Sequence, residues 1–102
     1  MTGRVDGKVA LVTGGSSGIG RGCSEKLAAE GAFVVVTDIQ DAMGADVVAG
    51  IKAAGGRAEY LHHDVTEEGE WEAVVGKVRE RHGRLDFLVN NAGIGIGGSV
   101  LT

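Results

Sequence analysis

This sequence has a single cysteine and no proline, and it lacks any long apolar run. Its one cysteine, Cys23, cannot form an internal disulfide, which fits a reducing compartment, so we expect a cytoplasmic protein. No segment approaches the roughly 20 consecutive apolar residues that a transmembrane helix needs. The first seven residues also lack the apolar core of a secretory signal peptide. We therefore expect no membrane partner.

Positive charge is in the minority. The chain carries 10 Lys and Arg against 14 Asp and Glu, a formal net charge of −4, and it has no cationic cluster. Proteins that bind nucleic acid normally present such a cluster, so nucleic acid is not an expected partner. Glycine is abundant, but its 19 residues gather at expected turns without a repeat, so low complexity does not explain them. A chain of 102 residues makes one domain at most.

The most informative stretch is an apolar run from Val9 that leads through a glycine-rich turn into the start of a helix. Gly14 allows a tight reversal after the strand, Gly18 allows the backbone to approach a diphosphate, and Gly20 allows the helix to pack closely. The first turn of that helix offers unpaired N–H groups and a partial positive charge, which suit an anion. Asp38 follows at the end of the next apolar run, where a dinucleotide site has its ribose-binding carboxylate.

Apolar strands alternate with amphipathic helices along the whole chain. The first strand is a continuous apolar run, as in a parallel strand covered on both faces, whereas the third is more polar, which suits a sheet edge. The expected strands are 8–12, 32–37, 57–62 and 85–89, and the expected helices are 18–30, 41–54 and a third that Thr66 caps and Gly83 ends. The inward positions predicted from helical spacing are Ile19, Cys23, Leu27 and Ala28, then Met43, Val47, Val48 and Ile51, then Trp71, Val74, Val75 and Val78. This β-α-β-α-β-α-β order predicts a Rossmann-type α/β fold with a parallel sheet and right-handed crossovers.

Three motifs resemble those of the short-chain dehydrogenase/reductase family, in the order that the family has them. They are the cofactor loop Thr13-Gly14-x-x-x-Gly18-x-Gly20, the adenine-pocket pair Asp64-Val65, and the second signature Asn90-Asn91-Ala92-Gly93. The resemblance spans nearly the whole chain and implies the strand order 3-2-1-4. It also implies that the first two helices cover one face of the sheet and the third covers the other.

The same resemblance implies that residues 1–102 form an incomplete dinucleotide-binding domain, the N-terminal part of a three-layer doubly wound fold truncated after the fourth strand. That strand would then be an exposed apolar edge. The family's catalytic serine, tyrosine, lysine and asparagine would lie beyond Thr102. We therefore identify no catalytic residue, expect this chain alone to catalyse no hydride transfer, and expect a homo-oligomer of the full-length form.

Asp38 leads us to expect NAD rather than NADP as the cofactor. A carboxylate here accepts hydrogen bonds from the ribose hydroxyls of NAD and repels the 2′-phosphate of NADP. No Arg or Lys stands nearby to reverse this preference, because Ile39 and Gln40 follow and Ser17 precedes Gly18. The alternative is that Asp38 is only a solvated residue at the end of a strand.

The resemblance assigns further residues to the cofactor. Asp64 would accept from the adenine amino group, with Val65 beside it, although Asp64 could instead be a partner for the N-terminus of the following helix. Asn91, Ala92 and Gly93 would line the ribose on the nicotinamide side, whereas Asn90 would tie the sheet together. The predicted cofactor-binding set is Gly14, Ser17, Gly18, Ile19, Gly20, Asp38, Ile39, Asp64, Val65, Asn91, Ala92 and Gly93.

The remaining reactive residues favour structural roles. Cys23 falls on an inward helical face, where a cysteine is usually a small core residue. His62 and His63 are sequential on a strand, so their side chains point to opposite faces and cannot share a metal. Trp71 belongs to the apolar face of its helix. We expect no metal site.

These features together predict the NAD-binding portion of an oxidoreductase that transfers a hydride between NAD(H) and a small alcohol or ketone. One alternative is a non-catalytic nucleotide-binding module. Another is an S-adenosylmethionine-dependent methyltransferase, against which the Thr13 to Gly20 spacing and the Asn90 to Gly93 motif argue. A phosphate-transferring P-loop is excluded, since no Gly-Lys-Ser or Gly-Lys-Thr follows the glycine loop. The residues do not encode the substrate.

Overall fold

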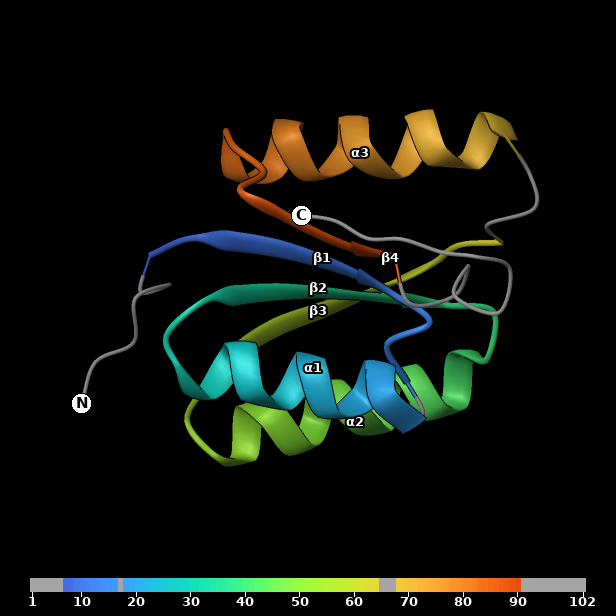
Figure 1. The fold of residues 1–102 in the computed structure, drawn as a ribbon. Coiled ribbons are helices and arrows are strands. Elements are labelled where there is room, and N and C mark those ends of the chain that lie inside the picture. The colour runs from blue at the N-terminus through green and yellow to red at the C-terminus, as the bar shows by residue number, and fades with distance from the viewer. Residues whose placement is uncertain (1–6, 17, 65–67, 91–102) are drawn as a thin grey trace.

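The computed structural model describes residues 7–16, 18–64 and 68–90 of the chain. Its elements run in strict alternation from an N-terminal strand to a C-terminal strand (Figure 1). They are β1 (Val9–Thr13), α1 (Gly18–Ala29), β2 (Phe33–Asp38), α2 (Asp41–Ala53), β3 (Arg57–His62), α3 (Glu68–His82) and β4 (Phe87–Asn90). None of the helices in these ranges is long and apolar enough to cross a bilayer.

All four strands are parallel and lie in the order β3-β2-β1-β4. Helices α1 and α2 cover one face of the sheet and α3 covers the other, so the described part of the chain has three layers (Figure 1). The predicted Rossmann-type fold, the strand order and the distribution of helices are confirmed. Because every strand points the same way, the carboxyl ends of β1, β2 and β3 meet at one edge of the sheet, where open α/β sheets bind ligands.

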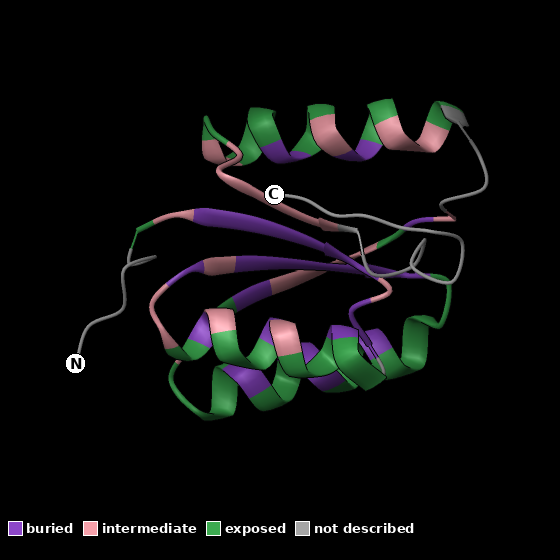
Figure 2. Ribbon diagram, viewed as in Figure 1, coloured by how far each residue is buried: buried purple, intermediate pink, exposed green. Residues whose placement is uncertain are grey.

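The sheet separates two apolar cores. Every residue of β1 is buried, and in β2 every residue after Phe33 is buried (Figure 2). Val12, Val34 and Val36 face α1 and α2, whereas Leu11 and Val35 face α3 with Val74 and Val78. Burial on both faces is why these two strands are continuous apolar runs rather than alternating ones.

Two of the predicted inward positions are wrong. Ile19 is 72% exposed and Met43 is 40% exposed. Both stand in the first turn of a helix, at the ligand edge of the sheet. The residues that α1 and α2 bury beside them are smaller, Gly20 and Ser24 in α1 and Gly44 in α2. At Gly44 the helix lies directly against the ring of Tyr60, which leaves no room for a side chain.

The last strand starts two residues later than predicted, at Phe87 rather than Leu85. Asp86, just before it, accepts a hydrogen bond from the Val9 N–H through Oδ2 (2.8 Å) and donates its own N–H to the Val9 carbonyl (2.9 Å). Arg84 forms an ion pair with the same carboxylate. Asp86 therefore closes the amino end of the β1–β4 pair instead of extending the strand.

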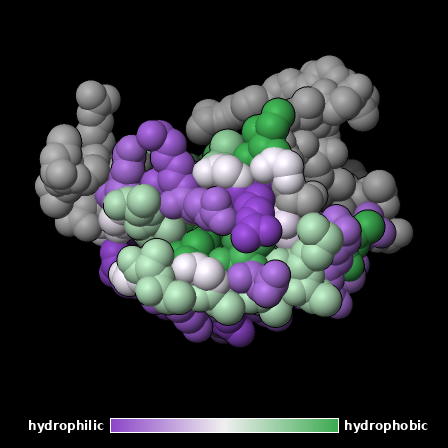
Figure 3. Space-filling model, turned by 90° about the horizontal axis from the view of Figure 1, so that it is seen from below, coloured by the Kyte–Doolittle hydropathy of each residue, from purple (hydrophilic) through white to green (hydrophobic). Residues whose placement is uncertain are grey.

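A shallow hollow lies between α1 and α2 on the outer side of their layer. Small residues line much of it, including Ala28, Ala29, Gly50 and Ala54. Figure 3 looks onto this layer and shows apolar surface between the two helices, flanked by polar side chains. The small residues allow the two helices to pack side by side, with Ile51 buried beneath them.

Candidate functional site

The loop between β1 and α1 depends on glycine at two positions for its backbone conformation. Gly14 has φ = 62° and Gly18 has φ = 56°, both in the left-handed region that side chains disfavour. A Cβ placed on Gly18 would meet no described atom within 4 Å. The space in front of Gly18 is therefore open, as close approach of a diphosphate to this backbone requires.

A third glycine of the loop, Gly15, was not predicted as a site residue. A Cβ there would lie 2.9 Å from Ser24 Oγ, 3.0 Å from the Val12 carbonyl and 3.1 Å from Val36 Cγ1. Ser24 Oγ itself donates to the carbonyls of Gly20 (2.9 Å) and Gly15 (3.3 Å). The absent side chain thus lets the start of α1 lie against the end of β1. In the sequence, only the Gly14-Gly15 pair indicated that position 15 requires a glycine.

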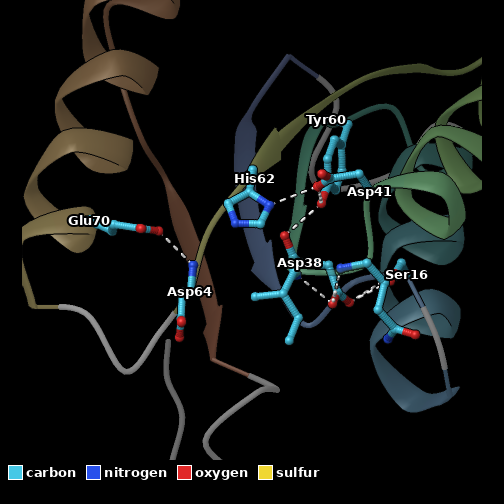
Figure 4. Close-up of polar contacts among 9 residues, drawn as sticks. Ser16, Asp38, Asp41, Tyr60, His62, Asp64 and Glu70 are labelled. Carbon is cyan, nitrogen blue, oxygen red and sulfur yellow. Dashed lines mark hydrogen bonds and ion pairs between the residues drawn. The ribbon is translucent and has the colours of Figure 1, made fainter.

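Asp38 ends β2 next to this loop, as predicted, but its carboxylate is already bonded within the protein (Figure 4). Oδ2 accepts from the Ser16 N–H (3.2 Å) and from the Ser16 hydroxyl, and Oδ1 accepts from the N–H groups of Ile39 (2.7 Å) and Gln40 (3.2 Å). A carboxylate has about four acceptor positions, so all of them are occupied. Asp38 is accordingly only 7% exposed.

These contacts determine the charge of Asp38. Burial would raise the pKa of its carboxyl, but the hydrogen bonds from Ser16, Gln40 and Ile39 outweigh burial, and the pKa lies below its usual value. Asp38 is therefore ionised at neutral pH. A ribose hydroxyl could bind it by taking the place of the Ser16 hydroxyl. Ser16 was missed by the sequence analysis, which named Ser17 instead.

The other predicted binding residues are placed only in part. Ile39 follows Asp38 and is 60% exposed, Gly20 is buried at the start of α1, and Asp64 is half-buried just after β3. The Asp64 N–H donates to Glu70 Oε1 in the first turns of α3 (2.7 Å), which joins this residue to the helix (Figure 4). Ser17, Val65, Asn91, Ala92 and Gly93 lie outside the described residues, as does the predicted cap Thr66.

A second polar cluster, formed by Tyr60, His62 and Asp41, lies beside Asp38 and was not predicted (Figure 4). The Tyr60 hydroxyl donates to the Asp38 carbonyl (2.6 Å) and to Asp41 Oδ1 (2.5 Å), and His62 Nδ1 lies 2.8 Å from the same Asp41 oxygen. Tyr60 and His62 are two residues apart on β3 and so share one face of the sheet. The cluster could not be predicted from the sequence, because it depends on the register of β2 with β3, which places Tyr60 beside Val36 and His62 beside Asp38.

His63 is buried between β2 and α3. Its Nδ1 lies 3.5 Å from Thr37 Oγ1, and its ring meets that of Trp71 edge to face at 4.6 Å. Its Nε2 has no hydrogen-bond partner among the described residues. Burial lowers the pKa of His63, and the nearby carboxylates of Glu70 and Asp64 only partly oppose this. The ring is therefore neutral at neutral pH.

We expect the free energy of unfolding to fall as the pH drops from 8 to 5, because of His63. Its pKa is lower in the folded chain than in the unfolded chain, so between the two values the unfolded state binds more protons. The stabilisation is complete above about pH 6.5 and is lost toward the lowered pKa, at up to about 1.4 kcal/mol per pH unit. Urea denaturation at pH 8, 6.5 and 5 measures the loss, and His63→Asn should flatten it.

His62→Asn provides the matched control. The hydrogen bond to Asp41 raises the pKa of His62, so its contribution has the opposite sign, being present below about pH 6.5 and lost as the pH rises through the raised value. Without His62 the decline toward pH 5 should persist or steepen. A His63→Asn chain with an unchanged pH dependence would show that another group is responsible.

The geometry defines a class of protein. A glycine turn follows the first strand of a parallel sheet, a helix begins at that turn, and an ionised carboxylate ends the neighbouring strand. This arrangement is that of a Rossmann-type dinucleotide-binding protein. The open space before Gly18 and the acceptor chemistry of Asp38 fit a dinucleotide.

Comparison with known proteins identifies the family. The family model described as short chain dehydrogenase matches residues 8–102, so the chain belongs to the short-chain dehydrogenase/reductase family. Cyclopentanol dehydrogenase from Comamonas sp. (strain NCIMB 9872) is 48% identical over 92 residues, which cover 90% of this chain and 37% of that protein.

Two solved structures show the same fold. A metagenomic short-chain oxidoreductase in complex with NADP matches with a TM-score of 0.85 and 43% identity, covering 87% of this chain and 40% of that one. A short-chain dehydrogenase/reductase from Burkholderia phymatum in complex with NAD matches with a TM-score of 0.80 and 33% identity, covering 83% of this chain and 30% of that one. This chain thus spans between 30% and 40% of the length of these three relatives.

Proposed function

We propose that this chain provides the NAD-binding part of an oxidoreductase that transfers a hydride between NAD(H) and an alcohol or ketone. The observation that carries the proposal is the ionised Asp38 at the end of β2, next to the glycine loop. When bound, the nicotinamide supplies the centre that accepts or donates the hydride. A cytoplasmic location fits the single cysteine, and a small alcohol as substrate fits the name of the cyclopentanol dehydrogenase relative.

Different residues of the chain bind different parts of the dinucleotide. The backbone at Gly18 and the N-terminus of α1 receive the diphosphate, while Gly14 makes the turn and Gly20 allows the helix to pack closely. Asp38 accepts from the adenosine ribose in place of the Ser16 hydroxyl, with Ile39 alongside. Asp64 and Val65 hold the adenine, and Asn91, Ala92 and Gly93 lie on the nicotinamide side.

The one tyrosine of the chain does not take part in hydride transfer under this proposal. The hydroxyl of Tyr60 donates to the Asp38 carbonyl and to Asp41, at the end of the site that would hold the adenosine ribose. Burial and the Asp41 carboxylate raise its pKa above the usual value of a tyrosine, which opposes a role as general base near neutral pH. The stretch described here therefore binds and orients, and it contributes no acid or base to the reaction.

The choice of NAD over NADP gives the first test. Calorimetric titration of the chain should give a lower Kd for NAD than for NADP, because Asp38 repels a 2′-phosphate. Replacing Asp38 by Ser together with Ile39→Arg should shift the ratio of the two affinities toward NADP by about 10- to 100-fold, that is, by about 1.4 to 2.8 kcal/mol. Ile39 is suited to this change because its side chain is exposed.

The matched control combines Asp38→Ser with Met43→Arg. Met43 is also an exposed apolar residue, four positions further along, so the variant has the same net charge but carries the guanidinium elsewhere. This control should shift the ratio of the two affinities toward NADP less than the variant with Ile39→Arg does. An unmodified chain that binds NADP more tightly than NAD would contradict the assignment of the cofactor. A chain that binds S-adenosylmethionine and neither dinucleotide would contradict the proposed function as a whole.

A further inference from the structure

The cluster of Tyr60, His62 and Asp41 is the group of reactive side chains that the proposed function does not use. It lies directly beside Asp38 (Figure 4). The Tyr60 hydroxyl contacts both the Asp38 carbonyl and the Asp41 carboxylate, and so links the cluster to Asp38. Asp41 is the first residue of α2, and its side chain is 65% exposed. An exposed carboxylate that two neighbouring side chains hold in place suggests a function beyond stability.

Two side chains contact the carboxylate of Asp41. Its Oδ1 accepts from the Tyr60 hydroxyl (2.5 Å) and contacts His62 Nδ1 (2.8 Å). The same Tyr60 hydroxyl donates to the Asp38 carbonyl (2.6 Å), so a single oxygen links the main chain of Asp38 to the carboxylate of Asp41. The Tyr60 ring lies against Gly44, where an added Cβ would overlap the ring carbons. The ring is therefore held by the first turn of α2.

The start of α2 would otherwise be favourable for a phosphate. The N-cap residue Gln40 makes no side-chain capping bond, and the helix begins three residues after the carboxylate that would hold the ribose. Free N–H groups and the positive end of the helix dipole attract anions. Because the Tyr60 hydroxyl joins the Asp38 main chain to the Asp41 side chain, a 2′-phosphate on a ribose bound at Asp38 would come close to this helix start. Asp41 is the acidic residue in the first turn of the helix, and its charge cancels the attraction.

We propose that Asp41 is a second specificity-determining residue, whose carboxylate, held by Tyr60 and His62, disfavours a nucleotide that carries a 2′-phosphate. The proposal rests on the proposed function, since it requires that Asp38 bind the adenosine ribose. It assigns Asp38 to the ribose hydroxyls and Asp41 to rejection of the phosphate. Tyr60 acts as a positioning residue that keeps the two acids in a fixed relation.

His62 makes this discrimination dependent on pH. When His62 is protonated, its charge offsets that of Asp41. The hydrogen bond to Asp41 raises the pKa of His62 from its usual value, which favours the protonated ring. The other charged or titratable groups around His62 are Tyr60 on its own strand, the adjacent His63, Asp38 on β2, Asp64 after β3, and Glu70 and Lys77 on α3. The carboxylates of Glu70 and Asp64 also favour the protonated ring. Discrimination against the 2′-phosphate should therefore weaken as the pH falls.

The test uses two nucleotides that differ only in the 2′-phosphate, adenosine 5′-monophosphate and adenosine 2′,5′-bisphosphate. Calorimetric titration of the chain at pH 8 gives the ratio of their affinities. Asp41→Asn keeps an oxygen that can accept from Tyr60 and His62 but removes the charge. It should raise the affinity for the bisphosphate, relative to the monophosphate, on the order of fivefold.

Asp46→Asn is the control for net charge. Asp46 is an exposed acid on the same helix, five residues further along, and the substitution removes one negative charge as Asp41→Asn does. It should change the ratio by less than about twofold, because an exposed charge further away is largely screened. A ratio that is the same in Asp41→Asn as in the unmodified chain, or that shifts equally in Asp46→Asn, would overturn the proposal.

A second measurement leaves Asp41 in place. Between pH 8 and pH 6 the relative affinity for the bisphosphate should rise in the unmodified chain and rise less in His62→Gln, where only the second ionisation of the phosphates, with a pKa of about 6, still changes. Identical pH profiles would overturn the role of His62. An unmodified chain that binds neither nucleotide would overturn the proposed function itself, whereas binding with an unaltered ratio in Asp41→Asn overturns this inference alone.

Discussion

Gly18→Val should reduce the affinity of the chain for NAD by about 100-fold or more. Gly18 has φ = 56°, and a β-branched residue held in this left-handed region costs on the order of 1–3 kcal/mol, so the loop would leave its conformation. If the loop did hold, the valine side chain would fill the open space in front of Gly18, where the diphosphate has to approach. Calorimetric titration with NAD measures the loss.

Gly22→Val makes the same substitution one turn further along α1. Its φ is not in the left-handed region, and a Cβ there meets no described atom within 4 Å. Because glycine and valine differ by less than about 1 kcal/mol in helix propensity, this variant should fold and should bind NAD as the unmodified chain does. If Gly18→Val retains full affinity and a native circular dichroism spectrum, the assigned role of the loop is wrong.

Leu11→Ala should lower the free energy of unfolding by about 2–5 kcal/mol. Leu11 is fully buried in the middle of β1, pairs with Val35 of β2 and Leu88 of β4, and packs toward α3 with Val74 and Val78. Truncation leaves a cavity between a central strand and its covering helix. Since domains of this size have a total stability of about 5–15 kcal/mol, the loss should be plain in the midpoint of urea denaturation.

Ile19→Ala is the control, and it also tests the corrected position of Ile19. It too shortens a branched aliphatic residue to alanine, but at a position that is 72% exposed, so the cost should be within about 0.5 kcal/mol. An equal loss of stability in the two variants would mean that Ile19 is buried, as its helical spacing first suggested. It would also remove the distinction between the core and the ligand edge of the sheet.

The order of the elements could be predicted because the two central strands have one strong pattern, whereas the strand order 3-2-1-4 followed from the family resemblance. Residues 9–12 and 33–36 are apolar without alternation, which occurs when a strand is covered on both sides, and glycines mark the ends of the helices. Helical spacing of apolar residues fails to predict burial where a residue is buried or exposed for a reason other than its apolarity. Ser24 is buried because its hydroxyl bonds two carbonyls, and Ile19 is exposed because it stands in the turn of α1 that faces the ligand edge.

For the candidate site, too, some residues could be predicted from the sequence and others could not. Gly14, Gly18 and Asp38 could be predicted, since the physical demands of a loop beside a diphosphate and of an acid beside a ribose fix residue type and spacing. The contacts of Ser16 with Asp38 and of Tyr60 with Asp41 could not. They join residues 19 to 22 positions apart, and they depend on the register of β2 with β3 and on the course of the loop.

The bonds between Val9 and Asp86 have a consequence for the synthesis of the chain. They join residues 77 positions apart, whereas the opposite edge of β1 finds its partner at Phe33, only 24 residues after Val9. A ribosome adds about 5–20 residues per second, so one edge of this wholly buried strand waits several seconds for β4 after the other edge has paired. During that interval β1 presents an unpaired edge to solvent, and this is when a nascent chain with this topology most needs a chaperone.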